Sequence, residues 1–332
     1  MADAHASIAV RTLRTLAQAA IAAGLLWALV AFGYIRMENL AGLRDQPGAV
    51  ALAALLAWLT IPVGAYRWLL LLRSQQISLG GGRVFWLTWF GIFANNYIPA
   101  SLGTDFSRAV FLFREYPESK TPVVVSIVLD RLAALGGILS ALALFSVKLL
   151  FMEHVPGWVL MLTYCAYVGL AATVGAGLYF RYRPSHHSLS AWLETRLGHS
   201  GLGRKICSFI VLLKDCKDSP GTVAKACALS TLNAVLMVLS FFVLAQAAGF
   251  HQLDLYTVGF ASPLSLIANM LPISPGGLGV GEGGFAQITM ILMPQAHLEG
   301  TGAVFLAFRL VVLVISLPGL LLLAGGRAGR RA

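Results

Sequence analysis

Charged side chains occur in stretches that are otherwise apolar enough to lie in a membrane: Asp105, Arg108, Asp130, Arg131, Glu282 and Arg309. An ionisable group inside a bilayer is energetically costly, so such a residue is by default a candidate for function. Arginine binds phosphate through planar, paired hydrogen bonds. The residue types therefore predict that a phosphate-bearing anion is recognised inside the membrane.

Two of these arginines, Arg131 and Arg309, each lie about nine residues into an apolar segment, at roughly 13 Å from opposite membrane faces. Guanidinium groups at these depths could hand a phosphate from one side to the other. In a structural alternative, Arg131 pairs with Asp105 or Asp130. Arg309 would pair with Glu282 in the same way, and both pairs would only hold neighbouring segments in place. The residue pattern is compatible with both interpretations.

Two polar stretches rich in glycine and proline, 95–108 and 269–282, interrupt apolar segments. Their shared residues have the same spacing: Asn96, Pro99, Ser101 and Gly103 in the first copy, and Asn269, Pro272, Ser274 and Gly276 in the second. An apolar segment with an Arg-Leu pair follows each copy, at Arg131 and at Arg309. We interpret the two stretches as an internal duplication.

Glycine ends each polar stretch before a second apolar arm begins. A helix that starts there presents free backbone N–H groups and the positive end of its dipole, which together bind anions. Gly276, Gly277 and Gly279 also permit positive φ and a close approach of ligand to backbone. In the alternative, glycine and proline only let two short helices turn and pack. The side chains of Asn96 and Asn269 are expected to satisfy the broken backbone or, less often, to contact the ligand.

The composition indicates a membrane protein, because only 11% of the 332 residues are charged, against roughly 25% in soluble domains. Apolar runs that approach or exceed the ~20 residues needed to cross a bilayer lie at 17–34, 49–72, 122–150, 158–180, 222–248 and 301–324. They predict an all-α protein with six transmembrane helices. The four cysteines show no metal-ligand spacing, and no nucleotide-binding loop is present, so no metal or cofactor is expected.

The segments 84–113 and 255–293 are apolar but broken near the middle, and neither arm is long enough to cross a bilayer. We predict two re-entrant helical hairpins, because broken backbone is tolerated at that depth only inside protein or beside a wet cavity. Lys and Arg mark the cytoplasmic loops, including the end of the second span at Arg67 and Arg73. Both termini are then cytoplasmic. The units 49–150 and 222–324 have inverted topology, as in alternating-access transporters.

The net charge of +10 reflects basic cytoplasmic loops rather than a nucleic-acid partner, because no nucleic-acid-binding pattern accompanies it. The most basic loop, 181–221, has apolar residues at near-helical spacing. It is predicted either to lie as an amphipathic helix on anionic lipid heads or to be a solvated loop.

The stretches 95–108, 130–132 and 275–282 together resemble the flippase-like family of the lysylphosphatidylglycerol synthase transmembrane region. The resemblance implies a bacterial inner-membrane protein that moves lipids between leaflets. Its partners would be a phospholipid, or a polyprenyl or hopanoid-type lipid. Residues implicated by position are Asn96, Pro99, Gly103, Asp105, Arg108, Asp130, Arg131, Pro275, Gly276, Gly277, Gly279 and Glu282. Thr104 stands where members often have a second glycine. No soluble synthase domain is recognised, so aminoacyl transfer is not implied.

Three functions follow as hypotheses. The first is a lipid flippase, with Ser101, Asn269, Ser274 and Arg309 added to the implicated residues as its substrate site. The second is an integral-membrane lipid-phosphate hydrolase or transferase that uses Glu282 and the arginines. The third is a non-transporting partner of a lipid- or glycan-modifying enzyme, such as a glycosyltransferase, docked through the basic loop.

Overall fold

The computed structural model describes residues 24, 27, 29–31, 34–97, 103–152, 155–182, 220–269, 277–294, 296 and 298–321. Regular secondary structure in these ranges is helical, and one isolated β-bridge joins Ile35 to Thr301. The predicted all-α class is therefore confirmed. Most of the predicted first span, the centres of both polar stretches (98–102 and 270–276) and the basic loop from 183 to 219 lie outside the described residues.

Four helical segments are long and apolar enough to cross a membrane, in agreement with four of the predicted spans. They contain α3 (Pro47–Ser74), α6 (Lys120–Phe145), α10 (Pro220–Ala247), and α13 (Gly302–Ser316) with η5 (Leu317–Leu320). Helix α7 (Gly157–Tyr182) covers the predicted span 158–180, but its described apolar part, Gly157–Ala172, is shorter than these four. The protein is thus a multi-pass membrane protein, and the count of six spans stays a prediction.

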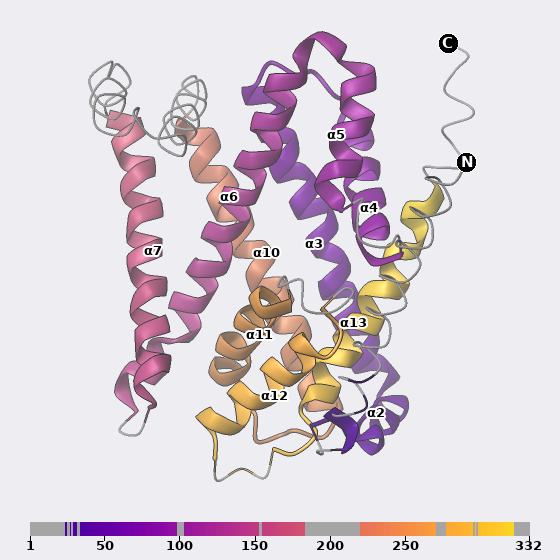
Figure 1. Cartoon of the computed structure of the whole chain (residues 1–332), viewed down its shortest axis with the longest axis vertical. Helices are drawn as coiled ribbons and strands as arrows, with labels where there is room; N and C mark the ends of the chain where they lie inside the picture. The colour runs from indigo at the N-terminus through magenta and orange to yellow at the C-terminus, as the bar shows by residue number, and fades with distance from the viewer. Residues whose placement is uncertain are drawn as a thin grey trace, which may run out of the picture.

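Two pairs of shorter helices lie between the long ones. The first pair is α4 (Gly81–Tyr97) and α5 (Thr104–Glu115), and the second is α11 (Leu255–Asn269) and α12 (Val280–Leu292). Figure 1 shows the pairs towards opposite ends of the long helices, α4 and α5 at the top and α11 and α12 at the bottom. Along the chain, α3 runs up towards the first pair, whereas α10 runs down towards the second.

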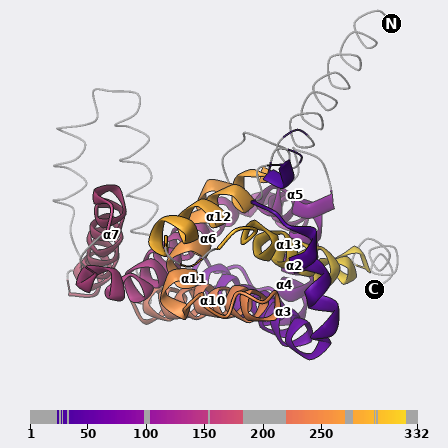
Figure 2. The same cartoon turned by 90° about the horizontal axis from the view of Figure 1, so that it is seen from below.

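The remaining described elements are short connections: α2 (Met37–Gly42), η1 (Leu43–Asp45), η2 (Pro117–Ser119) and η3 (Val147–Phe151). Seen from below, α7 stands at one edge of the molecule beside α6 (Figure 2). The packed body therefore consists mainly of α3 to α6 and α10 to α13.

Small residues allow α10 to pack closely on α3 and α6. The Ser240 hydroxyl donates to the Ala53 carbonyl oxygen at 2.9 Å, joining α10 to α3. At the crossing with α6, a Cβ on Gly137 would lie only 2.4 Å from the Ser230 carbonyl oxygen. Because that oxygen belongs to a helix backbone, it cannot move aside without shifting α10.

We expect Gly137→Ala to destabilise the protein by about 1–3 kcal/mol through overpacking, despite alanine's better helix propensity. The measurement is thermal unfolding of the detergent-solubilised protein. Gly64→Ala is the matched control in the α3–α10 contact, because its nearest neighbour, Asn233 Nδ2, would be at an ordinary 3.6 Å. An unchanged melting temperature for Gly137→Ala would contradict the close crossing.

The first helix of each short pair also packs on a long helix from the other half of the chain. On α4, Trp89 Nε1 donates to the Ile315 carbonyl oxygen near the end of α13 at 2.8 Å. Carbonyls at a helix end need such donors, and Pro318 has no N–H to supply one. On α11, Gly259 lies against the ring of Phe145 on α6, where a Cβ would be 2.2 Å from Cγ. Each half of the chain therefore packs a short helix against a long helix of the other half.

Candidate functional site

A buried ionic cluster forms where α3, α5 and α6 meet. Asp130 accepts hydrogen bonds from two arginines: Arg67 Nε is 2.7 Å from Oδ1, and Arg108 Nη1 is 3.1 Å from Oδ2. The three residues are 4–7% exposed. Two guanidinium groups share one carboxylate, so the cluster carries one net positive charge.

Neighbouring helices complete this cluster. Arg67 Nη1 donates to the Ser230 hydroxyl on α10 at 3.1 Å, and Arg108 Nη2 donates to the Thr88 hydroxyl on α4 at 3.2 Å. The Arg108 guanidinium lies over the Trp68 ring, 4.3 Å from its centroid. Arg108 Nε is buried and has no hydrogen-bond partner among the described residues. The guanidinium of Arg108 is thus held firmly, but its donors are not all used.

The second feature is an accessible ion pair at the start of α5. Gly103 is the N-cap of this helix, and Asp105 lies in its first turn. Arg131 Nε on α6 donates to Asp105 Oδ2 at 2.5 Å. The two side chains are 50% and 34% exposed. Within the described residues this is the only hydrogen bond of Arg131, so both Nη nitrogens remain available to a ligand.

The equivalent arginine of the second half has a different environment. Arg309 Nε lies 2.9 Å from Glu282 Oε1, and Glu282 is fully buried. Arg309 Nη2 donates to Asn269 Oδ1 at 2.7 Å and to the Gly277 carbonyl oxygen at 3.3 Å. Arg309 therefore ties the end of α11 to the residues that precede α12.

Glycine geometry and a carboxylate together start helix α12. Gly277 and Gly279 have positive φ, +68° and +86°, which explains why glycine occupies both positions. A Cβ on Gly277 would lie 2.1 Å from Asn269 Oδ1. The Gly279 N–H donates to Glu282 Oε2 at 2.8 Å, so the positive end of this helix already has an anion from its own first turn.

Both halves of the chain therefore use the same pairing. An arginine in a long helix, Arg131 or Arg309, contacts an acid in the first turn of a short helix, Asp105 or Glu282. The ion pairs that the structural interpretation required are thus present. Their exposure differs, because Glu282 is fully buried whereas Asp105 is one-third exposed. Only the first pair leaves an arginine accessible to a ligand.

The other predicted site residues have simpler environments or are not described. Asn96 Nδ2 donates to the Ile92 carbonyl oxygen, one turn earlier inside α4, at 2.9 Å. Thr104 Oγ1 donates to the Gly91 carbonyl oxygen at 3.0 Å and joins α5 to α4. The predicted residues outside the described ranges are Pro99, Ser101, Ser274, Pro275 and Gly276.

Arg67 lies inside the membrane body, which corrects the prediction that it marks the cytoplasmic end of the second span. Its side chain is 7% exposed and donates to Asp130. The available signal was its position seven residues before the end of α3 at Ser74, about 10 Å inside the helix end. Arg73, six residues later, is exposed as a loop-facing charge should be.

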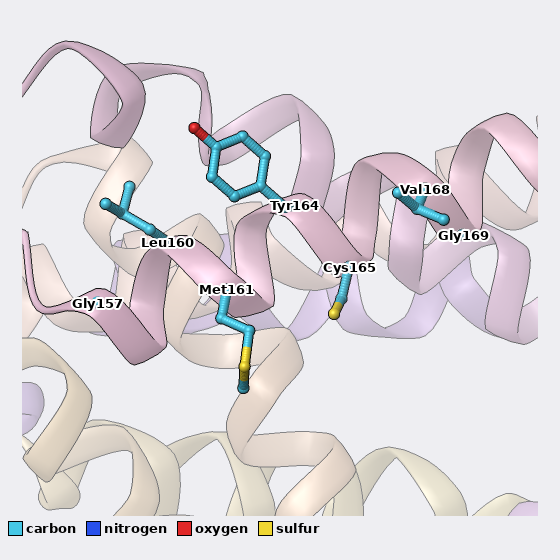
Figure 3. A pocket seen from close by; sticks show the side chains of 7 residues that line it. All are labelled: Gly157, Leu160, Met161, Tyr164, Cys165, Val168 and Gly169. Carbon is cyan, nitrogen blue, oxygen red and sulfur yellow. The ribbon is translucent and has the colours of Figure 1, made fainter.

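A shallow, open groove on the exposed face of α7 is separate from these groups. Its lining residues all come from one helix: Gly157, Leu160, Met161, Tyr164, Cys165, Val168 and Gly169 (Figure 3). None of them carries a formal charge at neutral pH, and none is a predicted site residue. The exposed apolar side chains of this face are those expected where a helix borders lipid.

Comparison with known proteins agrees with the motifs. The chain matches the family described as "Lysylphosphatidylglycerol synthase TM region" over residues 15–319. A search among curated proteins found no match. The family match spans the long helices, both short pairs and all of the charged residues described above. The chain therefore belongs to the family of the lysylphosphatidylglycerol synthase transmembrane region.

Proposed function

We propose that this protein moves a phosphate-headed lipid between the two leaflets of a bacterial inner membrane by alternating access. Membership of a lipid-related membrane family and four membrane-length helices support a lipid as ligand. The observation that carries the proposal is the Arg131–Asp105 pair, an accessible guanidinium at the start of a short helix. Its Nη nitrogens, which have no partner among the described residues, and the first-turn N–H groups of α5 are donors suited to a phosphate.

The arrangement of the helices supports alternating access. The short pairs lie towards opposite ends of the long helices (Figure 1), and their members have 12 to 17 residues, too few to cross a bilayer. We propose that they enter the membrane from opposite sides as the hairpins of an inverted repeat. Arg73, Arg83 and Arg114 then lie on the cytoplasmic side.

Cysteine labelling tests this topology. Exposed Glu118 lies between α5 and α6, and exposed Gln252 lies between α10 and α11. In a background without native cysteines, Glu118→Cys is expected to react with an impermeant thiol reagent only from the cytoplasm. Gln252→Cys is expected to react only from the outside. Labelling of both from one side of intact cells would refute the inverted arrangement.

An enzymatic role finds less support in the geometry. Glu282, the carboxylate proposed for lipid-phosphate hydrolysis or transfer, is fully buried, and both of its oxygens lie against protein donors. A general acid or base must instead reach the reacting group. Reconstitution in liposomes with fluorescent lipids separates the two functions. Leaflet exchange without covalent change supports transport, whereas a chemically altered headgroup supports an enzyme.

A further inference from the structure

The charges inside the membrane body do not cancel. Among the described residues, four arginines and three acids lie within the helices away from the ends of the body: Arg67, Arg108, Arg131, Arg309, Asp105, Asp130 and Glu282. Arg131 with Asp105 is a neutral pair, and so is Arg309 with Glu282. The remaining group, Arg67 with Arg108 and Asp130, therefore carries the single excess positive charge.

This excess charge is placed where it needs a counter-ion. Its three residues are at most 7% exposed, and an unneutralised charge in such surroundings is strongly unfavourable. Arg108 Nε has no hydrogen-bond partner among the described residues. Arg108 lies one turn after Asp105 on α5, and its partner Asp130 directly precedes Arg131 on α6, so the cluster adjoins the accessible pair. The excess charge thus acts on the accessible pair at the start of α5.

We infer that the transported lipid has a headgroup with one net negative charge, a phosphodiester without a compensating cation, and that Arg67 sets this selectivity. The inference rests on the proposed function. One phosphodiester beside Arg131 brings the net charge of the buried cluster and the accessible pair together to zero. A zwitterionic headgroup leaves one positive charge, and a headgroup with two or more negative charges leaves the group negative. Arg67 does not contact the lipid; it acts through Asp130, whose charge it shares with Arg108.

The test uses proteoliposomes and lipids labelled on an acyl chain, so that the headgroup charge is unchanged. For the wild type we expect phosphatidylglycerol to exchange about tenfold faster than phosphatidylethanolamine. Arg67→Met removes the excess charge and is expected to bring the ratio of the two rates to about one. Arg67→Lys is the matched control, because it keeps the charge and is expected to keep the preference. A merely structural role of Arg67 would change both rates together and leave their ratio unchanged.

A second variant covers the case in which Arg67→Met does not fold. Asp105→Asn adds one positive charge at an accessible position. Phosphatidic acid carries about two negative charges at pH 8. The ratio of its exchange rate to that of phosphatidylglycerol is expected to be about fivefold higher for this variant than for the wild type. Replacing chloride by gluconate distinguishes the lipid from a soluble counter-ion. We expect the ratio of phosphatidylglycerol to phosphatidylethanolamine exchange by the wild type to stay the same. A changed ratio would assign the anion site to a soluble ion instead.

Each result decides the inference. Equal exchange of phosphatidylglycerol and phosphatidylethanolamine by the wild type overturns it while leaving lipid transport intact. An unchanged preference in folded Arg67→Met, or an unchanged preference in Asp105→Asn, also overturns it. The absence of exchange for every lipid is a different outcome, because it removes the proposed function itself.

Discussion

Replacing Arg131 by Gln is expected to reduce lipid exchange by at least about 100-fold, which corresponds to the loss of a charged, bidentate phosphate contact. The fold should persist, because Arg131 is half-exposed and its one hydrogen bond to a described residue is to a partly exposed carboxylate. Lysine should restore part of the rate, since it keeps the charge but not the planar donor pair. The measurement is exchange of labelled lipid in proteoliposomes that contain equal amounts of folded protein.

Arg83→Gln is the matched control for this change. Arg83 also forms an exposed pair with a carboxylate, Glu115, with side chains 43% and 41% exposed. It lies near the start of α4, however, at the end of the short pair opposite the start of α5. Loss of an exposed pair costs little, so exchange should be unchanged.

A further variant tests whether Arg131 has only the structural role of pairing with Asp105. In Asp105→Asn with Arg131→Gln, recovered exchange would show that the guanidinium is structural and would remove Arg131 from the site.

Much of the helix order could be predicted because it depends on local properties. Apolar length identified α3, α6, α10 and α13 as membrane segments. Glycine and proline showed where α4 ends and α12 begins, since the backbone at Gly277 and Gly279 requires positive φ. Even the N-terminal cap of α12 has a sequence signal, because Glu282 stands three residues after Gly279.

The partners of the charged residues could not be predicted in the same way. Arg67 and Asp130 are 63 positions apart, and Arg67 and Ser230 are 163 apart. No periodicity reports which faces of α3, α6 and α10 meet, because packing is decided by shape after the helices form. For the same reason the sequence suggested equal roles for Arg131 and Arg309. Only the three-dimensional contacts reveal that one is accessible and the other is surrounded by protein donors and acceptors.

This difference leads to a contrasting expectation for Arg309. Removing it by Arg309→Gln leaves the fully buried Glu282 without its counter-ion, which costs about 3–5 kcal/mol or forces the carboxyl to take up a proton. It also frees Asn269 and Gly277, which Arg309 holds together. We therefore expect a large fall in the melting temperature of the solubilised protein, unlike the small change expected for Arg131→Gln.

The double variant Glu282→Gln with Arg309→Gln separates a structural role of Arg309 from contact with the lipid. Neutralising both members removes the buried unpaired charge, so the double variant should be more stable than Arg309→Gln alone. If Arg309 only positions the start of α12, exchange should also recover to within about tenfold of the wild-type rate. Recovery of stability without exchange would instead mean that Arg309 binds the phosphate, and the relay between the two arginines would then be required.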